Sequence, residues 1–246
     1  PALLLCALLA GPAAAQEVPF VTTPDHVTLA MLELAEVGPA DRVVDLGSGD
    51  GRIVIVAAKR FGARGLGVEI VPELVARSRA AALAAGVADR VEFREQDLFA
   101  TDLAGFSVVT MYLLPEVNLQ LRPRLLALPA GTRIVSHDWD LGDWAPERTL
   151  TIPVPDKALG REKLSRVHRW TVPARVDGAW CAGAARLVVQ QRFDRFSAAL
   201  DEAPAPPRVF DGRVRGLALE AVGPVLPALA FDGAALAVDG RRFRRC

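Results

Sequence analysis

The sequence predicts a mostly parallel, doubly wound α/β sheet with a small C-terminal β-meander appendage. Apolar strand patterns and helical patterns alternate from about residue 22 to residue 137, as in chains built from strands and crossover helices. After about residue 176 the helical pattern stops, and short apolar segments are separated by Gly, Pro and Asp-Gly turns. Of the 246 residues, 51% are hydrophobic and 24% are charged, which excludes disordered and fibrous classes.

The α/β part is expected to begin with a helix at Thr22-Thr23-Pro24-Asp25, where a threonine would act as the N-cap and Pro24 would occupy the first turn. Strands are expected at 42–46, 65–70, 91–96, 106–113 and 133–137. Helices are expected at 53–61, 72–85 and 119–128. Two more strands, 148–154 and 166–172, predict an antiparallel pair at the edge of the sheet.

The C-terminal segment carries three hairpin-type turn signals. They are Asp211-Gly212, Asp232-Gly233 and Asp239-Gly240. We therefore divide the chain into a leader over residues 1–15, an α/β domain over 16–175 and a β-rich appendage over 176–246. Two cysteines fall in the appendage, Cys181 and Cys246; a bridge between them is possible but the sequence does not specify it.

The N-terminal residues 1–15 read PALLLCALLAGPAAA and carry no charge. A short apolar run, a Gly-Pro break and a run of alanines are typical of a secretory signal peptide, and the run is too short for a membrane-spanning helix. We therefore expect an exported, periplasmic protein. The alternatives are an uncleaved anchor that leaves the domain in the cytosol, and a buried helix of the fold.

The most informative motif is the turn that follows the first strand. Asp45 ends an apolar run, and Gly47-Ser48-Gly49-Asp50-Gly51 leads directly into a helix. Glycines allow a sharp bend and let a ligand lie against bare main chain. A nicotinamide-binding turn would place its third glycine one residue later, which counts against a dehydrogenase. The flanking acids suit a ligand with a cationic group and repel a pyrophosphate.

Two further acids are expected at the same edge of the sheet. Glu69 ends the second strand, where a carboxylate can accept hydrogen bonds from both hydroxyls of a ribose. Asp97 follows the third strand, where it can accept from an adenine amino group while apolar neighbours pack on the base. The glycine turn, Glu69 and Asp97 thus lie at the ends of three consecutive strands and are expected in the crevice where open α/β sheets bind ligands.

These motifs together resemble those of class I S-adenosylmethionine-dependent methyltransferases, over about residues 20–175. The stretches PFVTTP, DLGSGDGRIVI and YLLP resemble more narrowly the small membrane-associated protein-lysine methyltransferases that modify the c-ring protein of ATP synthase and the adenine nucleotide translocase. The resemblance implies a Rossmann-like fold, S-adenosyl-L-methionine as the cofactor and methyl transfer by direct in-line displacement. It does not account for the C-terminal β segment.

The resemblance also implies a role for each motif. The methionine part of the cofactor would contact Asp45, Gly47, Ser48, Gly49, Asp50 and Gly51, with Asp45 or Asp50 near its ammonium group. The adenosine part would contact Glu69, Ile70, Asp97 and Leu98. The methyl group would meet its acceptor at Tyr112, Leu113, Leu114 and Pro115, which would position the reactants without a general base. Thr22, Thr23 and Pro24 would form a lid strand.

Several of these residues have a structural alternative. Asp97 could cap the turn that follows it, Tyr112 could end a buried strand, and His137 is more often a packed strand-end histidine than a base. Trp139 and Trp144 could line a channel for a lysine side chain by cation–π contact or could belong to the core. The sequence shows no metal site.

The expected activity is N-methylation of a protein lysine or another amine, with an envelope or membrane protein as a candidate substrate. The 29 basic and 29 acidic residues balance, so we expect no nucleic acid substrate, because phosphate binding needs a cationic surface. The alternative is an exported binding protein that keeps the cofactor fold without turnover, since S-adenosylmethionine is made in the cytosol.

Overall fold

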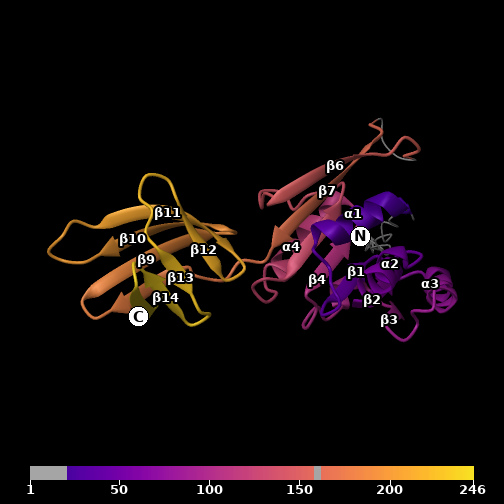
Figure 1. Ribbon diagram of the computed structural model, residues 1–246, viewed down its shortest axis with the longest axis horizontal. Helices are drawn as coiled ribbons and strands as arrows, with labels where there is room; N and C mark the ends of the chain where they lie inside the picture. Colours follow the sequence, from indigo (N-terminus) through magenta and orange to yellow (C-terminus); the bar gives the residue numbers. More distant parts are fainter. Residues whose placement is uncertain (1–20, 158–161) are drawn as a thin grey trace, which may run out of the picture.

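The computed structural model describes residues 21–157 and 162–246. The expected leader, residues 1–15, lies outside the described residues. Figure 1 shows the two sheets of the molecule side by side along its long axis, with the helices confined to the N-terminal part. The predicted fold class, a mostly parallel α/β sheet followed by a β-rich appendage, is confirmed.

The first sheet has seven strands in the order β3-β2-β1-β4-β5-β7-β6. Its parallel strands are β1 (Arg42–Leu46), β2 (Arg64–Glu69), β3 (Val91–Glu95), β4 (Val108–Met111) and β5 (Arg133–His137). The antiparallel edge pair is β6 (Arg148–Pro153) and β7 (Leu164–Thr171), as the sequence predicts. The chain order reverses between β1 and β4, so their carboxyl ends form the crevice typical of ligand sites.

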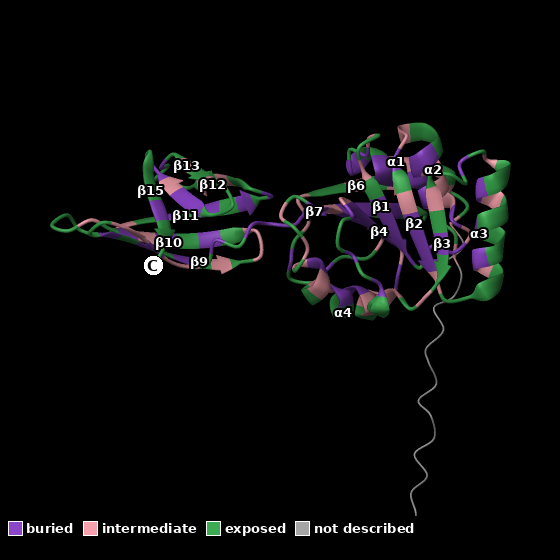
Figure 2. Ribbon diagram, turned by 90° about the horizontal axis from the view of Figure 1, so that it is seen from below, coloured by how far each residue is buried: buried purple, intermediate pink, exposed green. Residues whose placement is uncertain are grey.

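Within residues 21–157 and 162–246, four α-helices cover the two faces of this sheet. They are α1 (Asp25–Leu34), α2 (Arg52–Phe61), α3 (Pro72–Ala84) and α4 (Pro115–Leu125), and a 3₁₀ turn, η1 (Leu98–Ala100), follows β3. Met31 of α1 and Ala57 of α2 pack on one face with Val43, whereas Leu121 of α4 packs on the other face with Val44. Figure 2 shows α4 on the opposite side of the strands from α1 and α2.

Three expectations about these elements are wrong in detail. Helix α4 begins at Pro115 rather than at Leu119, because a proline suits the first turn of a helix. The strand expected at 106–113 is regular over Val108–Met111. The N-cap of α1 is Pro24, and no threonine side chain caps it. The hydroxyl of Thr23 contacts a histidine instead, as described below.

The second sheet is antiparallel and has the order β12-β11-β10-β9-β8-β15-β14-β13. Its strands are β8 (Gly178–Ala182), β9 (Ala185–Arg192), β10 (Arg195–Asp201), β11 (Arg208–Arg215), β12 (Ala218–Val222), β13 (Leu229–Phe231), β14 (Ala235–Val238) and β15 (Arg241–Arg245). The sheet curls until its edge strands β12 and β13 lie next to each other. Trp180, Phe210 and Phe243 fill its core, and a disulfide joins Cys181 to Cys246.

Two of the three predicted Asp-Gly turns are present in this sheet. Asp232-Gly233 connects β13 to β14, and Asp239-Gly240 connects β14 to β15 with both residues at positive φ. The third prediction is wrong, because Asp211-Gly212 lies within β11. A Cβ atom at Gly212 would lie 2.3 Å from the Phe196 ring, so this glycine makes room for an aromatic side chain on the neighbouring strand.

The appendage is joined to the α/β part by the polypeptide chain and also contacts it through side chains and a main-chain hydrogen bond. The ring of Phe193 stacks on buried Trp144, with 6.1 Å between the ring centroids. Arg192 forms an ion pair with Asp143, and the Ala174 amide donates to the Gly216 carbonyl. The α/β core therefore includes a side chain from the appendage.

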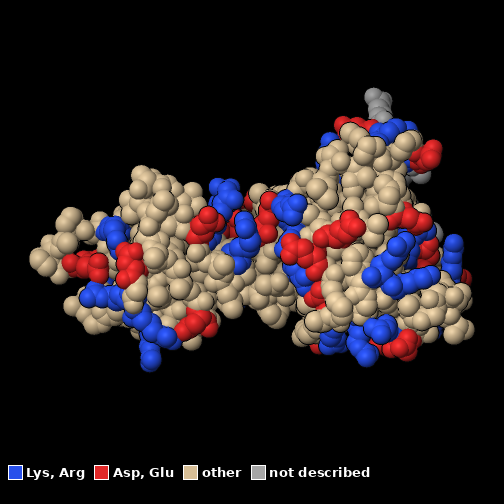
Figure 3. Space-filling model, viewed as in Figure 1, with Lys and Arg blue, Asp and Glu red and all other residues tan. Residues whose placement is uncertain are grey.

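The surface carries both signs of charge. Figure 3 shows blue and red side chains interspersed over the visible face of both parts. Within the described ranges, no helix combines the length and the apolar character needed to cross a membrane.

Candidate functional site

The glycine-rich turn joins β1 to α2 at the crevice. The amides of Gly47 and Ser48 both donate to the Val68 carbonyl, and the Gly51 amide donates to the Ser48 carbonyl. A pyrophosphate would need such amides as donors, but here the protein itself uses them. These amides are therefore not free to bind a pyrophosphate. This agrees with the glycine spacing, which counts against a nicotinamide dinucleotide as the ligand.

Glycine is required at two positions of this turn. Gly47 has a φ of 73°, and a Cβ atom there would lie 2.8 Å from the Leu113 side chain. Gly51 has a φ of 78°, and a Cβ atom there would lie 2.6 Å from the Phe93 ring. Both are left-handed conformations that disfavour other residues. The close approach of Leu113 also places the YLLP segment directly beside the glycine turn.

The two acids of the turn differ in charge environment. Asp45 is 2% exposed and accepts a 2.7 Å hydrogen bond from Thr110. Burial raises the pKa of Asp45 to about 7, and Glu69 and Asp50 add to the rise. Burial would also raise the pKa of Asp50, but hydrogen bonds from Arg52 hold it below its ordinary value. Asp45 is therefore the acid that a cationic ligand group would stabilise.

The Glu69 carboxylate links the glycine turn to the segment that follows β2. Its Oε2 accepts from the Gly49 amide at 3.0 Å, and its Oε1 accepts from the Ile70 and Val71 amides at 2.8 and 3.0 Å. A carboxylate offers about four acceptor positions, so one remains for a ligand hydroxyl. The next side chain, Ile70, is 68% exposed and offers an apolar surface at the edge of the crevice.

Asp97 and Leu98 stand at the carboxyl end of β3. Asp97 is exposed, and its Oδ1 accepts from the Phe99 amide at 2.8 Å. It therefore caps η1, which is the structural role that the sequence also allowed. Among the described residues, no donor contacts its Oδ2. Leu98 is half-buried against the core beneath the crevice. The structure thus brings together, along the ends of three adjacent strands, the residues of the turn, Glu69, Ile70, Asp97 and Leu98.

On the other side of the turn, residues 112–114 connect β4 to α4, and Pro115 is the first residue of that helix. The Tyr112 ring lies over the His137 ring, with 3.9 Å between centroids, and its hydroxyl donates to Asp138 at 3.3 Å. Burial and the nearby Asp138 carboxylate raise the pKa of Tyr112 to about 12, so the phenol stays protonated.

His137 is a packed residue at the end of its strand, which is the structural role that the sequence favoured over that of a catalytic base. Its Nδ1 lies 3.1 Å from the Thr23 hydroxyl, and its Nε2 lies 2.8 Å from the Ser165 hydroxyl. Burial lowers the pKa of His137 to about 4, which keeps the ring neutral. Thr23 is held at this place because its carbonyl accepts from Arg52 at 2.8 Å. The segment 22–24 therefore lies between α2 and β5, but it is not a strand, so the expected lid strand is wrong as secondary structure.

The two tryptophans after β5 differ from each other. Trp144 is 1% exposed and belongs to the core, so the channel role is wrong for it, whereas Trp139 is 44% exposed. The sequence reasoning missed Thr110, Ser165 and Lys157, which contact Asp45, His137 and Asp138. These partners lie far away in the chain, so no local pattern indicates them.

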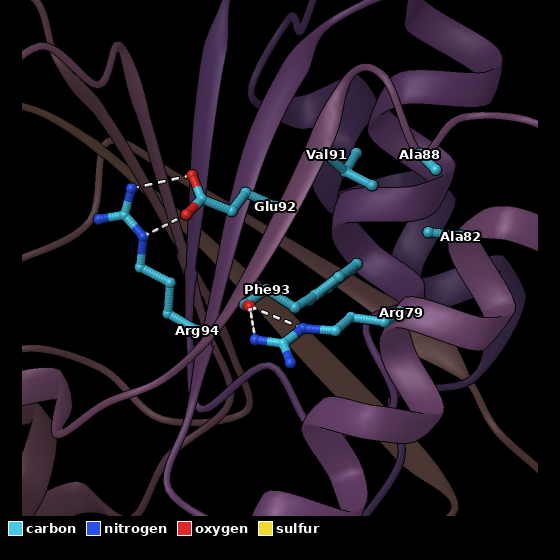
Figure 4. Close-up of a pocket in the computed structure, with 7 residues that line it drawn as sticks. All are labelled: Arg79, Ala82, Ala88, Val91, Glu92, Phe93 and Arg94. Carbon is cyan, nitrogen blue, oxygen red and sulfur yellow. Dashed lines mark hydrogen bonds and ion pairs between the residues drawn. The ribbon is translucent and has the colours of Figure 1, made fainter.

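A surface pocket of about 280 Å³ lies elsewhere, between α3 and β3. Figure 4 shows Arg79 reaching the Phe93 carbonyl and Arg94 paired with Glu92 around it. Because β3 is an edge strand, Arg79 satisfies a main-chain acceptor that no neighbouring strand reaches. The described part of the chain holds no cluster of three or more side chains suited to a metal ion.

Residues 45–148 match the model of the ANTKMT methyltransferase domain family. A protein-lysine N-methyltransferase of Saccharolobus islandicus is 42% identical over 137 residues, which are 55% of this chain and 85% of the relative. The adenine nucleotide translocase lysine N-methyltransferase of Mus musculus is 38% identical over 132 residues, 53% of this chain and 57% of the relative. A second Mus musculus relative, the lysine N-methyltransferase of the ATP synthase c-ring protein, is 40% identical over 108 residues, 44% of this chain and 43% of the relative.

A solved structure is also similar to the α/β part. It is an RNA methyltransferase from Salinibacter ruber in complex with S-adenosyl-L-homocysteine, with 52% identity and a TM-score of 0.57. The match covers 63% of this chain and 96% of that chain. The chain spans about half the length of the two mouse relatives, and the Salinibacter structure is the one of these relatives that holds the product of the methyl donor.

Proposed function

Because the chain belongs to the family of S-adenosylmethionine-dependent methyltransferases with the ANTKMT-type domain, we propose that it methylates the side-chain amine of a protein lysine. The observation that carries the proposal is the 42% identity to an archaeal protein-lysine N-methyltransferase over 85% of that relative. An envelope or membrane protein is the proposed substrate, in line with the translocase and the ATP synthase protein named for the mouse relatives.

The cofactor would supply an electrophilic methyl group on a sulfonium. In our proposal Asp45 faces its ammonium, since Asp50 is already neutralised by Arg52. Glu69 would hold the ribose, Ile70 and Leu98 would enclose the adenine, and Asp97 would accept from the adenine amino group. The main-chain bonds to Glu69 support this arrangement, because they fix the carboxylate before a ligand arrives.

The chain's own residues would align the acceptor and exclude water. Tyr112 and His137 form a packed wall: the phenol stays protonated, and both ring nitrogens of His137 lie within hydrogen-bond distance of the Thr23 and Ser165 hydroxyls. A lysine with an ordinary pKa of about 10.4 must lose a proton before it can attack, and a dry wall favours the neutral amine. Positioning and desolvation are therefore the proposed contributions of this site.

We also propose that the domain is exported and that residues 176–246 form a separate β unit. The disulfide between Cys181 and Cys246 supports export, because such bonds persist in oxidising compartments. The competing arrangement keeps the domain in the cytosol behind an uncleaved anchor. Fractionation of cells that produce the full-length chain distinguishes the two: cytosolic recovery with an intact leader would contradict export.

The substrate proposal is tested by supplying purified protein with labelled S-adenosylmethionine and three separate acceptors: envelope extract, total RNA and total DNA. We expect label in a protein band, and lysine as the labelled residue after hydrolysis. Label in RNA would favour the activity named for the Salinibacter relative and overturn the lysine proposal. Binding of S-adenosylhomocysteine without label in any acceptor would favour a binding protein without turnover.

A further inference from the structure

The ammonium group of Lys157 lies on the side of the crevice where we place the methyl acceptor, next to Tyr112. The chain has three lysines, Lys59, Lys157 and Lys163. The Nζ of Lys157 lies 2.8 Å from Asp138 Oδ2 and donates to the Leu164 carbonyl at 2.6 Å. Its side chain is 15% exposed, whereas lysines seldom lie so deep in a protein.

Asp138, which receives this ammonium, is rigidly placed. It is a non-glycine residue with a φ of 63°, a conformation that costs energy unless its surroundings impose it. Its Oδ1 accepts from the Arg166 amide at 3.0 Å, and its own amide donates to the Arg166 carbonyl at 2.6 Å. The carboxylate is therefore fixed by β7 before any amine binds.

This carboxylate lies beside the residues that we place at the point of methyl transfer. Tyr112 donates to the same Oδ2 that contacts Lys157. The next residue, Leu113, packs against Gly47 in the cofactor turn. A continuous line of contacts thus runs from the glycine turn through Tyr112 to the Lys157 ammonium.

We propose that Asp138 and Tyr112 form the subsite for the acceptor's ammonium group, and that Lys157, which fills it, is itself methylated within its own molecule. The inference rests on the proposed function. The ammonium first loses a proton to solvent. The nitrogen lone pair then forms the new N–C bond, the S–C bond breaks, and its electron pair stays on sulfur, which leaves S-adenosylhomocysteine.

The contacts of Lys157 also predict how far the methylation proceeds. A neutral amine has two N–H groups and one lone pair. Asp138 and the Leu164 carbonyl take two of the three positions on nitrogen, which leaves the third for the lone pair. A second methyl group would displace one of these bonds. We therefore expect one methyl group on Lys157 and little further addition.

The test incubates the full chain alone with labelled S-adenosylmethionine and maps the three lysines by peptide mass. We expect label on Lys157 at a rate per molecule that does not change with protein concentration. The matched control is Lys163→Arg, since the Lys163 Nζ lies in the same hairpin but contacts a carbonyl instead of a carboxylate. That variant should keep its label, whereas Lys157→Arg should lose it.

A second variant addresses the subsite itself. Asp138→Asn should lower labelling of Lys157 by more than about tenfold, because one partner of a part-buried ion pair is removed. Its binding of S-adenosylhomocysteine should match the parent, which shows that the crevice is still folded. Polylysine is supplied in a parallel reaction as an external acceptor, so that turnover is measured independently.

Three results would overturn the inference alone while the proposed function stands: labelled polylysine with unlabelled Lys157, equal label on all three lysines, or a rate that rises with protein concentration. If neither polylysine nor Lys157 is labelled although S-adenosylhomocysteine binds, the proposed function fails and the inference fails with it.

Discussion

Replacing the buried acid Asp45 with Asn should change how the stability of the ligand-free protein depends on pH. Below the ordinary pKa of 3.8 the carboxyl is protonated in both the folded and unfolded states. As the pH rises from there to about 7, the unfolded chain ionises while the folded protein keeps the proton, so the parent loses stability. Over the whole window the loss approaches roughly 4 kcal/mol, because the folded pKa is about 7.

An asparagine does not ionise, so it removes this loss. Asn can still accept from Thr110, which limits the cost of the substitution itself. We expect the free energy of unfolding of Asp45→Asn, relative to the parent, to rise by about 3 kcal/mol between pH 4.5 and pH 7.5. Urea unfolding of both proteins at the two pH values measures this difference.

The matched control is Asp50→Asn in the same turn. Arg52 holds the pKa of Asp50 below its ordinary value, so its contribution is lost only as the pH falls through that lowered pKa, and its difference from the parent should not grow between pH 4.5 and 7.5. If Asp45→Asn shows the same difference from the parent at both pH values, Asp45 is not protonated in the folded state and the reasoning fails.

Three other changes test the remaining parts of the structure. Glu69→Ala should weaken S-adenosylhomocysteine binding by more than tenfold in calorimetry, with Glu69→Gln intermediate, because three main-chain amides lose a charged acceptor; equal affinity would remove Glu69 from the site. Replacing Cys181 and Cys246 with Ser should destabilise the second sheet by about 4 kcal/mol and leave cofactor binding unchanged; loss of binding would contradict separate units. Phe193→Ala should lower the melting temperature of the α/β part through a cost of about 3 kcal/mol; an unchanged melting temperature would show that this contact contributes nothing.

The fold was predictable where local patterns and packing agree. The central strands β1 and β4 are almost fully buried because helices cover both faces of the sheet, and this burial appears in the sequence as short apolar runs. The interpretation of Asp211-Gly212 as a turn failed for a different reason. Gly212 is needed because the Phe196 ring on the neighbouring strand occupies the space of a Cβ atom. A contact with another strand cannot be recognised from the local sequence.

The same distinction applies to the candidate site. The glycine turn and Glu69 were predictable, because a sharp strand-to-helix bend and a strand-end acid are local features. The role of Asp138 as the partner of Lys157 was not, since the lysine arrives from a hairpin 19 residues later and the two side chains meet only through β5 and β7. Only the tertiary structure brings them together.

The charges of the crevice favour a cationic ligand over an anionic one. Asp50 is paired with Arg52 and Asp138 with Lys157, so each of these acids already has a cation. Within the described residues, Asp45 and Glu69 form no ion pair with a basic side chain. The repulsion between these acids is part of what raises the pKa of Asp45. A ligand with an ammonium group would relieve that repulsion and release a proton near neutral pH, whereas a phosphate would increase it. S-adenosylhomocysteine should therefore bind more tightly as the pH rises from 5 to 7, and Asp45→Asn should abolish this dependence.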